Sequence, residues 1–293
     1  MRKFCFELKN LTKYFYPVEL ISFAYILLTV IYIAVFSYKI DNAATLLLNR
    51  ILITGLLLLI AFIDTNKESK FLNLVRYLFA PILIIYWYPE TYYMNECIFS
   101  NLDHLFIQAD EWLFGCQPAL EFSKHFPYRW FSELMSFGYF SYYLMIVFIA
   151  FYFYVTNKPV ERKALFIILC SFFMYYIIFI ILPVVGPQFY YPEPANQVPK
   201  GYFFRELLMF IQSHGEKPTG AFPSSHVGVS LIFLIIICKY ACRYFAYFLP
   251  LVTILILSTV YIKAHYVIDV IGGFISVPPI YWLSDKCWQW LDK

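Results

Sequence analysis

Two histidines in the second half of the chain lie beside residues whose chemistry suits a phosphate group. His226 closes the stretch 221–226, AFPSSH, which leads from a loop into an apolar run. Ser224 or Ser225 is expected to cap the helix that begins there. The first N–H groups of a helix lack intrahelical partners, and together with the helix dipole they favour an anion. The pattern therefore places His226 within reach of a phosphate bound at this helix end.

The second histidine, His265, precedes Asp269 by four residues in the stretch 258–269, STVYIKAHYVID. On a helix this spacing stacks the two side chains on one face. A carboxylate beside one imidazole nitrogen fixes the tautomer and leaves the other nitrogen free to attack. Asp269 also begins an apolar run, where a lone charge is costly, so it needs a partner. His265 is the nearest one.

These three side chains form a nucleophile, an orienting carboxylate and a separate acid. We expect His265 to attack phosphorus and form a phosphohistidine while His226 protonates the departing oxygen. His226 would then act as a base on water or on an acceptor alcohol. The chain has no Asp-rich metal motif, so we expect neither a metal nor another cofactor.

The composition indicates a membrane as the solvent for most of the chain. Of its 293 residues, 61% are hydrophobic and only 14% are charged, whereas a soluble domain has about a quarter charged residues. The net charge of +3 gives no support to nucleic-acid binding. We expect a single integral domain, an all-α bundle of about eight transmembrane helices. The apolar runs occupy residues 18–38, 43–63, 72–92, 134–155, 164–183, 225–240, 244–262 and 266–283.

Basic residues gather in one set of short loops, which the positive-inside rule assigns to the cytoplasm. Both termini then lie in the cytoplasm, and loops 93–133 and 184–223 lie on the opposite side of a plasma or inner membrane, or in a lumen. Segments such as 110–114 are expected to form short interfacial helices there. The basic residues are Arg2, Lys3, Lys9, Lys13, Lys67, Lys70, Arg76, Lys158, Arg162, Lys163, Lys239, Arg243, Lys286 and Lys293.

The motifs around the two histidines resemble those of the PAP2 superfamily, the type 2 phosphatidic acid phosphatases. The family's Pro-Ser-Gly-His motif is matched by residues 223–226, with Ser225 in place of glycine. Its Ser-Arg-x5-His-x3-Asp motif is matched at Ser258, His265 and Asp269, with Thr259 in place of arginine. Its Lys-x6-Arg-Pro motif is not recognisable. The resemblance covers the chain from Leu134 on.

This resemblance implies a six-helix catalytic core over residues 134–285, preceded by N-terminal helices in residues 1–92. It also implies hydrolysis of a lipid phosphate or transfer of a phospho-headgroup from a membrane lipid. The missing arginine, together with stretches 110–118 and 182–188, resembles the branch of inositol phosphorylceramide synthases and related phosphotransferases. In that comparison Gln188 stands where a relative has a basic residue.

The transition state of phosphoryl transfer still needs positive partners. Among the basic residues of the external loops, Lys217 and Lys263 lie nearest to the two motifs. We therefore predict that Ser224, Ser225, Lys217 and Lys263 bind the phosphate. The alternative for each lysine is an interfacial side chain that extends to the lipid headgroups.

Two other functions remain open on the sequence alone. The histidines and Asp269 could form the proton relay of a transporter or channel, although such a relay is expected near the bilayer midplane. The chain could also be a family member that has lost activity together with the arginine. The lipid, the acceptor and the oligomeric state are not determined, and Cys97 and Cys116 could form a disulfide in an oxidising compartment.

Overall fold

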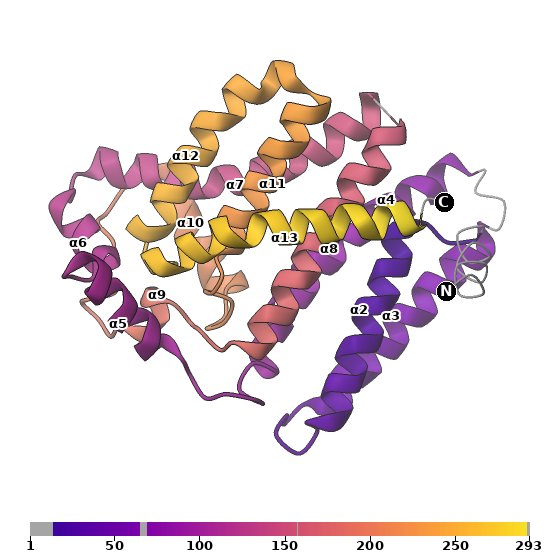
Figure 1. Ribbon diagram of the computed structural model, residues 1–293, viewed down its shortest axis with the longest axis horizontal. Helices are drawn as coiled ribbons and strands as arrows, with labels where there is room; N and C mark the ends of the chain where they lie inside the picture. Colours follow the sequence, from indigo (N-terminus) through magenta and orange to yellow (C-terminus); the bar gives the residue numbers. More distant parts are fainter. Residues whose placement is uncertain (1–13, 65–68, 157, 292–293) are drawn as a thin grey trace.

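A computed structural model describes residues 14–64, 69–156 and 158–291. Six of the basic residues used to orient the chain, Arg2, Lys3, Lys9, Lys13, Lys67 and Lys293, lie outside this part. The described residues form helices and connecting loops without a strand (Figure 1). The predicted all-α fold is thus confirmed. The long helices are α2 (Pro17–Val35), α3 (Ala43–Ile63), α4 (Lys70–Glu90), α7 (Arg129–Thr156), α8 (Lys158–Ile181), α11 (Ser225–Tyr240), α12 (Phe245–Tyr261) and α13 (Val267–Leu291).

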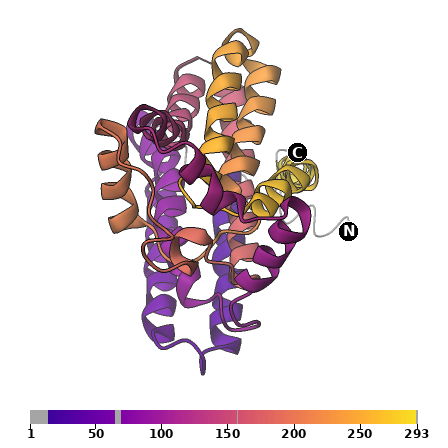
Figure 2. The same cartoon turned by 90° about the vertical axis from the view of Figure 1, so that its left-hand side faces the viewer.

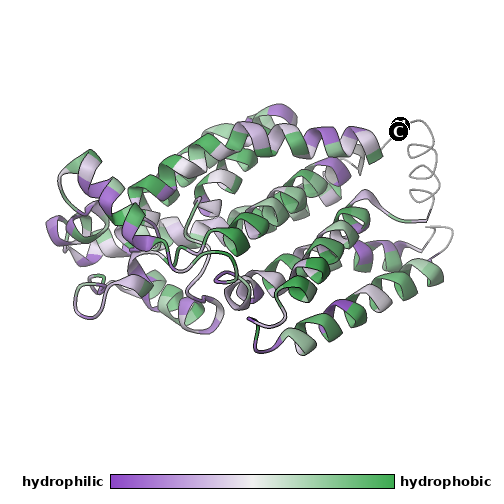
Figure 3. Ribbon diagram, turned by 60° about the horizontal axis from the view of Figure 1, so that its bottom comes forward, coloured by the Kyte–Doolittle hydropathy of each residue, from purple (hydrophilic) through white to green (hydrophobic). Residues whose placement is uncertain are grey.

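Seven of these helices are long and apolar enough to cross a membrane, which indicates an integral membrane protein. The eighth predicted span, α11, is also apolar but has 16 residues, or about 24 Å of helix. That is less than the roughly 30 Å of a hydrocarbon core. Figure 3 shows hydrophobic residues along most of each long helix, whereas hydrophilic residues gather in the loops and short helices at one end.

The short helices lie together at the end of the bundle that faces the viewer in Figure 2. As predicted, the segment around 110–114 is helical, within α5. Two turns of 3-10 helix, η1 (Thr91–Tyr93) and η2 (Cys242–Tyr244), flank long helices elsewhere. The short helices are α5 (Asp103–Phe114), α6 (Pro118–His125), α9 (Pro187–Tyr190) and α10 (Phe203–Gly215).

Charged residues inside the apolar helices are paired with one another. Arg50 interrupts the apolar run of α3, yet its guanidinium bonds to Glu90 at the end of α4. Arg76 donates to Glu19 of α2 at 2.6 Å through Nε and to Asp64 at 3.2 Å. Because an unpaired ion in hydrocarbon is costly, this pairing explains how helices with internal arginines can form membrane spans.

Helix α11 lies at the centre of the bundle, in contact with α7, α8, α12 and α13. Close approach depends on small residues. A Cβ at Gly228 would lie 1.6 Å from the Tyr175 hydroxyl of α8, and one at Gly273 would lie 2.9 Å from the Ser224 carbonyl oxygen. The start of α11 is therefore pressed against the start of α13, which brings the two histidine motifs together.

Candidate active site

The structure places the two motif histidines side by side. His226 lies in the first turn of α11, and His265 lies in the short loop between α12 and α13. Nε2 of His265 is 3.3 Å from Nδ1 of His226. His265 is buried, with 3% of its surface exposed, whereas His226 is partly exposed. The pair is thus reachable from the His226 side.

The hydrogen bond that orients His265 differs from the one predicted. Its Nδ1 lies 2.8 Å from the carbonyl oxygen of Ala221 and 3.6 Å from Oδ2 of Asp269. His265 precedes α13 rather than lying on it, and Asp269 Oδ2 accepts a hydrogen bond from the Tyr266 amide at 2.8 Å. The carboxylate therefore caps the helix beside His265, while the Ala221 carbonyl oxygen accepts the hydrogen bond from the imidazole N–H.

This contact fixes the protonation of both rings. A carbonyl oxygen only accepts, so Nδ1 of His265 carries the proton and Nε2 carries the lone pair. Burial lowers the pKa of His265 from 6.5 to about 4, although the Ala221 carbonyl and Glu216 favour the charged form. His265 is then neutral at ordinary pH. Nδ1 of His226 must donate across the 3.3 Å contact.

Two aspartates on α5 hold the backbone around the histidines. Asp110 accepts hydrogen bonds from the amides of Val267 and Ile268, each at 2.9 Å, and so caps α13. Asp103 accepts from the amides of residues 185 and 186 and from the Tyr266 hydroxyl, at 2.8 to 2.9 Å. The sequence reasoning missed these roles. The available signal was the seven-residue spacing of two acids on one face of a short helix.

The start of α11 has a serine N-cap, as the sequence predicted. Oγ of Ser224 accepts from the amide of Val227 at 3.4 Å and so acts as the N-cap. Its own amide donates to the Asp269 carbonyl oxygen at 3.0 Å. Ser225 is buried as the first helical residue. The amides of Ser225 and His226 occupy the positions that lack intrahelical acceptors, so they are available to an anion.

A hydrogen-bonded cluster around one acid, Glu216, lies next to His226; of its members, only Gln188 was named from the sequence. The ring of Tyr139 packs 4.6 Å from the His226 ring, centroid to centroid, and its hydroxyl donates to Glu216 at 3.2 Å. Glu216 also accepts from Gln188 at 2.7 Å and from Gln212 at 3.2 Å. Burial raises the pKa of Glu216 despite these donors. No sequence motif marked this glutamate.

The predicted phosphate-binding lysines have other surroundings. Nζ of Lys263 donates to the carbonyl oxygens of Ala195 and Gln197, each at 2.6 Å, and so anchors the loop between α9 and α10. Burial, then Lys124 and Arg205, lower its pKa to about 8. Lys217 is exposed next to Glu216. In the described part of the chain, neither lysine forms an ion pair or hydrogen bond with the histidines.

The remaining sequence candidates lie away from this site. Cys97 and Cys116 are both free, the first buried and the second exposed, so the disulfide is absent. The other three histidines, His104, His125 and His214, are exposed. Within residues 14–64, 69–156 and 158–291, no group of three His, Cys, Asp or Glu side chains is arranged to hold a metal ion.

Comparison with known proteins identifies a family for most of this region. The family model described as the PAP2 superfamily matches residues 104–283, more than half of the 293 residues. The match begins before Leu134 and therefore includes Asp110 of α5. No curated protein and no solved structure gives a significant match.

Proposed function

Because the chain belongs to the PAP2 superfamily, we propose that it transfers phosphoryl groups from a membrane lipid through a phosphohistidine at His265. The superfamily comprises phosphatases and phosphotransferases. The observation that carries the proposal is the contact of 3.3 Å between Nε2 of His265 and Nδ1 of His226. It sets an imidazole lone pair against a proton donor at the start of α11. The family match gives no support to a transporter.

In the first step, phosphorus enters between the two rings and separates them. The Nε2 lone pair of His265 forms the N–P bond, and the P–O bond to the lipid alcohol breaks. His226 acts here as the doubly protonated imidazolium: its Nδ1 gives a proton to the departing oxygen, so a neutral diacylglycerol-type alcohol leaves and the His226 ring becomes neutral. The Ala221 carbonyl keeps its bond to Nδ1–H of His265 and so stabilises the positive charge that grows on this ring.

In the second step, water or an acceptor alcohol occupies the place of the leaving group. Its proton passes to Nδ1 of His226, its oxygen bonds to phosphorus, and the N–P electron pair returns to Nε2 of His265. The free amides of Ser225 and His226 at the helix end are placed to stabilise the phosphoryl oxygens. Hydrolysis and headgroup transfer thus use one intermediate and differ only in the acceptor.

The charges around the histidines favour a phosphodiester donor over a phosphomonoester. In the described residues no Lys or Arg forms an ion pair or hydrogen bond with His226, His265 or Glu216, and Glu216 brings an acidic group instead. A phosphomonoester carries nearly two negative charges at neutral pH, a diester only one. Headgroup transfer, as in the inositol phosphorylceramide synthase-like branch, agrees better with this balance than does hydrolysis of phosphatidic acid.

The proposal also covers the extent of the catalytic core and the orientation of the protein in the membrane. The catalytic core over residues 134–285 and an active site on the extracytoplasmic side, with both termini in the cytoplasm, remain part of this proposal. The positive-inside distribution of Lys and Arg supports that orientation.

The experiment is to trap the intermediate on purified protein in proteoliposomes. The protein is incubated with a lipid that carries a labelled phosphorus, quenched in alkali, and the label is mapped by peptide sequencing. Label stable in alkali and labile in acid is expected on His265 and absent from His265→Ala. His226→Ala should form it at least a hundredfold more slowly.

His125→Ala is the matched control, because this histidine is exposed and its ring contacts Glu121 of its own helix, not the histidine pair. It should label like the unmodified protein. Label that persists in His265→Ala, or that maps to another residue, would overturn the proposal. Comparing phosphatidic acid with a phosphodiester lipid in the same assay tests the donor class separately.

A further inference from the structure

A second site lies at the end of the bundle opposite the histidines. A cavity of about 340 Å³ is lined by the ends of five long helices, α2, α4, α7, α8 and α13. Helix α13 connects the two regions. It begins at Val267, two positions after His265, and its Trp288 lines the cavity. The 21 residue steps from Val267 to Trp288 correspond to about 32 Å of helix. The cavity therefore faces the other membrane surface.

Three basic side chains line this cavity, and two of them have no acidic partner among the residues that the structure describes. Arg76 is neutralised by Glu19 and Asp64, at 2.5 and 3.2 Å. Lys70 and Arg162 form no ion pair with any carboxylate in the described part of the chain. Both side chains are exposed. The described residues thus give the mouth of the cavity a net positive charge.

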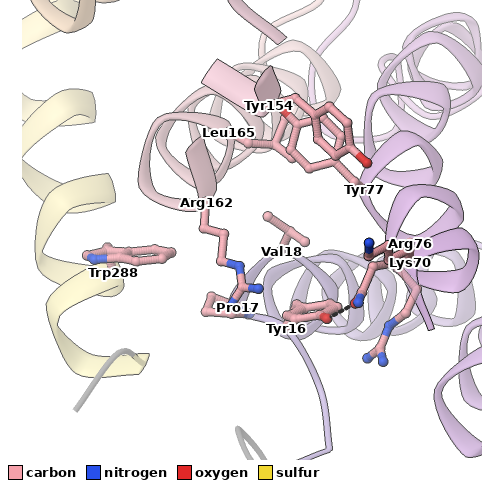
Figure 4. Close-up of a pocket in the computed structure, with 11 residues that line it drawn as sticks. Tyr16, Pro17, Val18, Lys70, Arg76, Tyr77, Tyr154, Arg162, Leu165 and Trp288 are labelled. Atoms are coloured by element: carbon pink, nitrogen blue, oxygen red, sulfur yellow. Dashed lines mark hydrogen bonds between the residues drawn. The ribbon is translucent and has the colours of Figure 1, made fainter. Parts of the chain in front are cut away.

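The Tyr16 ring packs against two of the three basic side chains, Arg162 and Arg76. The guanidinium of Arg162 lies 5.0 Å from the centre of the Tyr16 ring, and that of Arg76 lies 4.3 Å from it. Figure 4 shows Arg162 of α8 and Lys70 of α4 on opposite sides of Tyr16, with Trp288 of α13 beyond Arg162. Tyrosine and tryptophan are the residues that favour the headgroup level of a bilayer.

We propose that this cavity binds the phosphate of an anionic phospholipid headgroup from the leaflet opposite the histidines. Its volume is in the range of sites for small ligands. Basic cavities between transmembrane helices on the cytoplasmic side are suited to anionic headgroups. Phosphate oxygens bridge Lys70 and Arg162, while the acyl chains follow the apolar helix surfaces into the bilayer. The ligand links α4 to α8 and stabilises their packing around α2.

The test measures lipid binding and does not depend on turnover. Delipidated protein in a neutral detergent is titrated with phosphatidylglycerol, with phosphatidylcholine and with glycerol 3-phosphate, and the bound fraction is measured by native mass spectrometry. The melting temperature is followed in parallel. Phosphatidylglycerol should bind and raise the melting temperature, whereas phosphatidylcholine and the soluble phosphate should bind at least tenfold more weakly.

The double variant Lys70→Gln/Arg162→Gln should bind phosphatidylglycerol about thirtyfold more weakly. It loses two cations, and each cation near a membrane surface contributes about 1 kcal/mol to binding an anionic lipid. Its melting temperature without lipid should change little, because both side chains are exposed and only the contact of Arg162 with the Tyr16 ring is lost. Lys124→Gln/Lys200→Gln removes the same charge from exposed positions that do not line the cavity and should bind like the original protein. Equal binding by the two double variants would overturn the proposal. Equal binding of glycerol 3-phosphate would refute the lipid assignment.

Discussion

Lowering the pH tests whether His265 is buried in its neutral form, because protonation of a buried imidazole must lower the free energy of unfolding. Burial lowers the pKa of this histidine from 6.5 to about 4. Between these two values the unfolded chain binds a proton at His265 and the folded chain does not. Folding stability should therefore fall as the pH falls from 6.5 to 4 and should change no further below that range. Above pH 6.5 His265 contributes no pH dependence.

The size of the effect follows from the shift in pKa. A difference between 6.5 and about 4, at 1.36 kcal/mol for each unit, corresponds to about 3 kcal/mol of unfolding free energy. The assay is chemical unfolding in detergent at pH 7.0 and 4.0 for the original protein and for His265→Gln. Glu216 and Asp110, whose pKa values are raised by burial, titrate in both proteins and largely cancel.

The original protein should lose about 3 kcal/mol more than His265→Gln over this pH interval. The same loss in both proteins would refute the reasoning, because His265 would then be free to take up its proton in the folded state. A larger loss in His265→Gln would reverse the sign and would show that the folded protein favours the charged imidazole.

Three substitutions test the packing that positions the site, each by chemical unfolding in detergent. Asp110→Ala removes two hydrogen bonds of 2.9 Å at the start of α13 and should cost about 3 kcal/mol; unchanged stability would show that this cap is dispensable. Gly228→Ala places a Cβ 1.6 Å from the Tyr175 hydroxyl and should cost about 1 to 3 kcal/mol. Adding Tyr175→Phe should recover part of that loss, and failure to do so would contradict the contact. Arg50→Ala leaves Glu90 without its partner and should cost about 3 to 5 kcal/mol, most of it restored in Arg50→Met/Glu90→Gln if the unpaired carboxylate is the cause.

Much of the fold could be predicted from the sequence because membrane helices are specified locally. A run of apolar residues forms a helix in lipid whatever its neighbours are, since the backbone must satisfy its own hydrogen bonds. Even the run interrupted by Asn49 and Arg50 is one helix, α3. The histidines and the Ser224 cap were predictable for a similar reason, because motif spacing and helix capping act over a few residues.

Only the tertiary structure decided which groups surround the histidines. The Ala221 carbonyl orients His265 from 44 positions away, and Asp110 caps α13 from 157 positions away. Glu216 reaches the site through Tyr139, 77 positions distant. A backbone carbonyl has no sequence signature, because every residue has one. The sequence around an acidic residue is also the same whether its side chain faces water or a buried hydrogen-bond donor. Such roles depend on how the helices pack, and the local sequence does not encode the distance between α5 and α13.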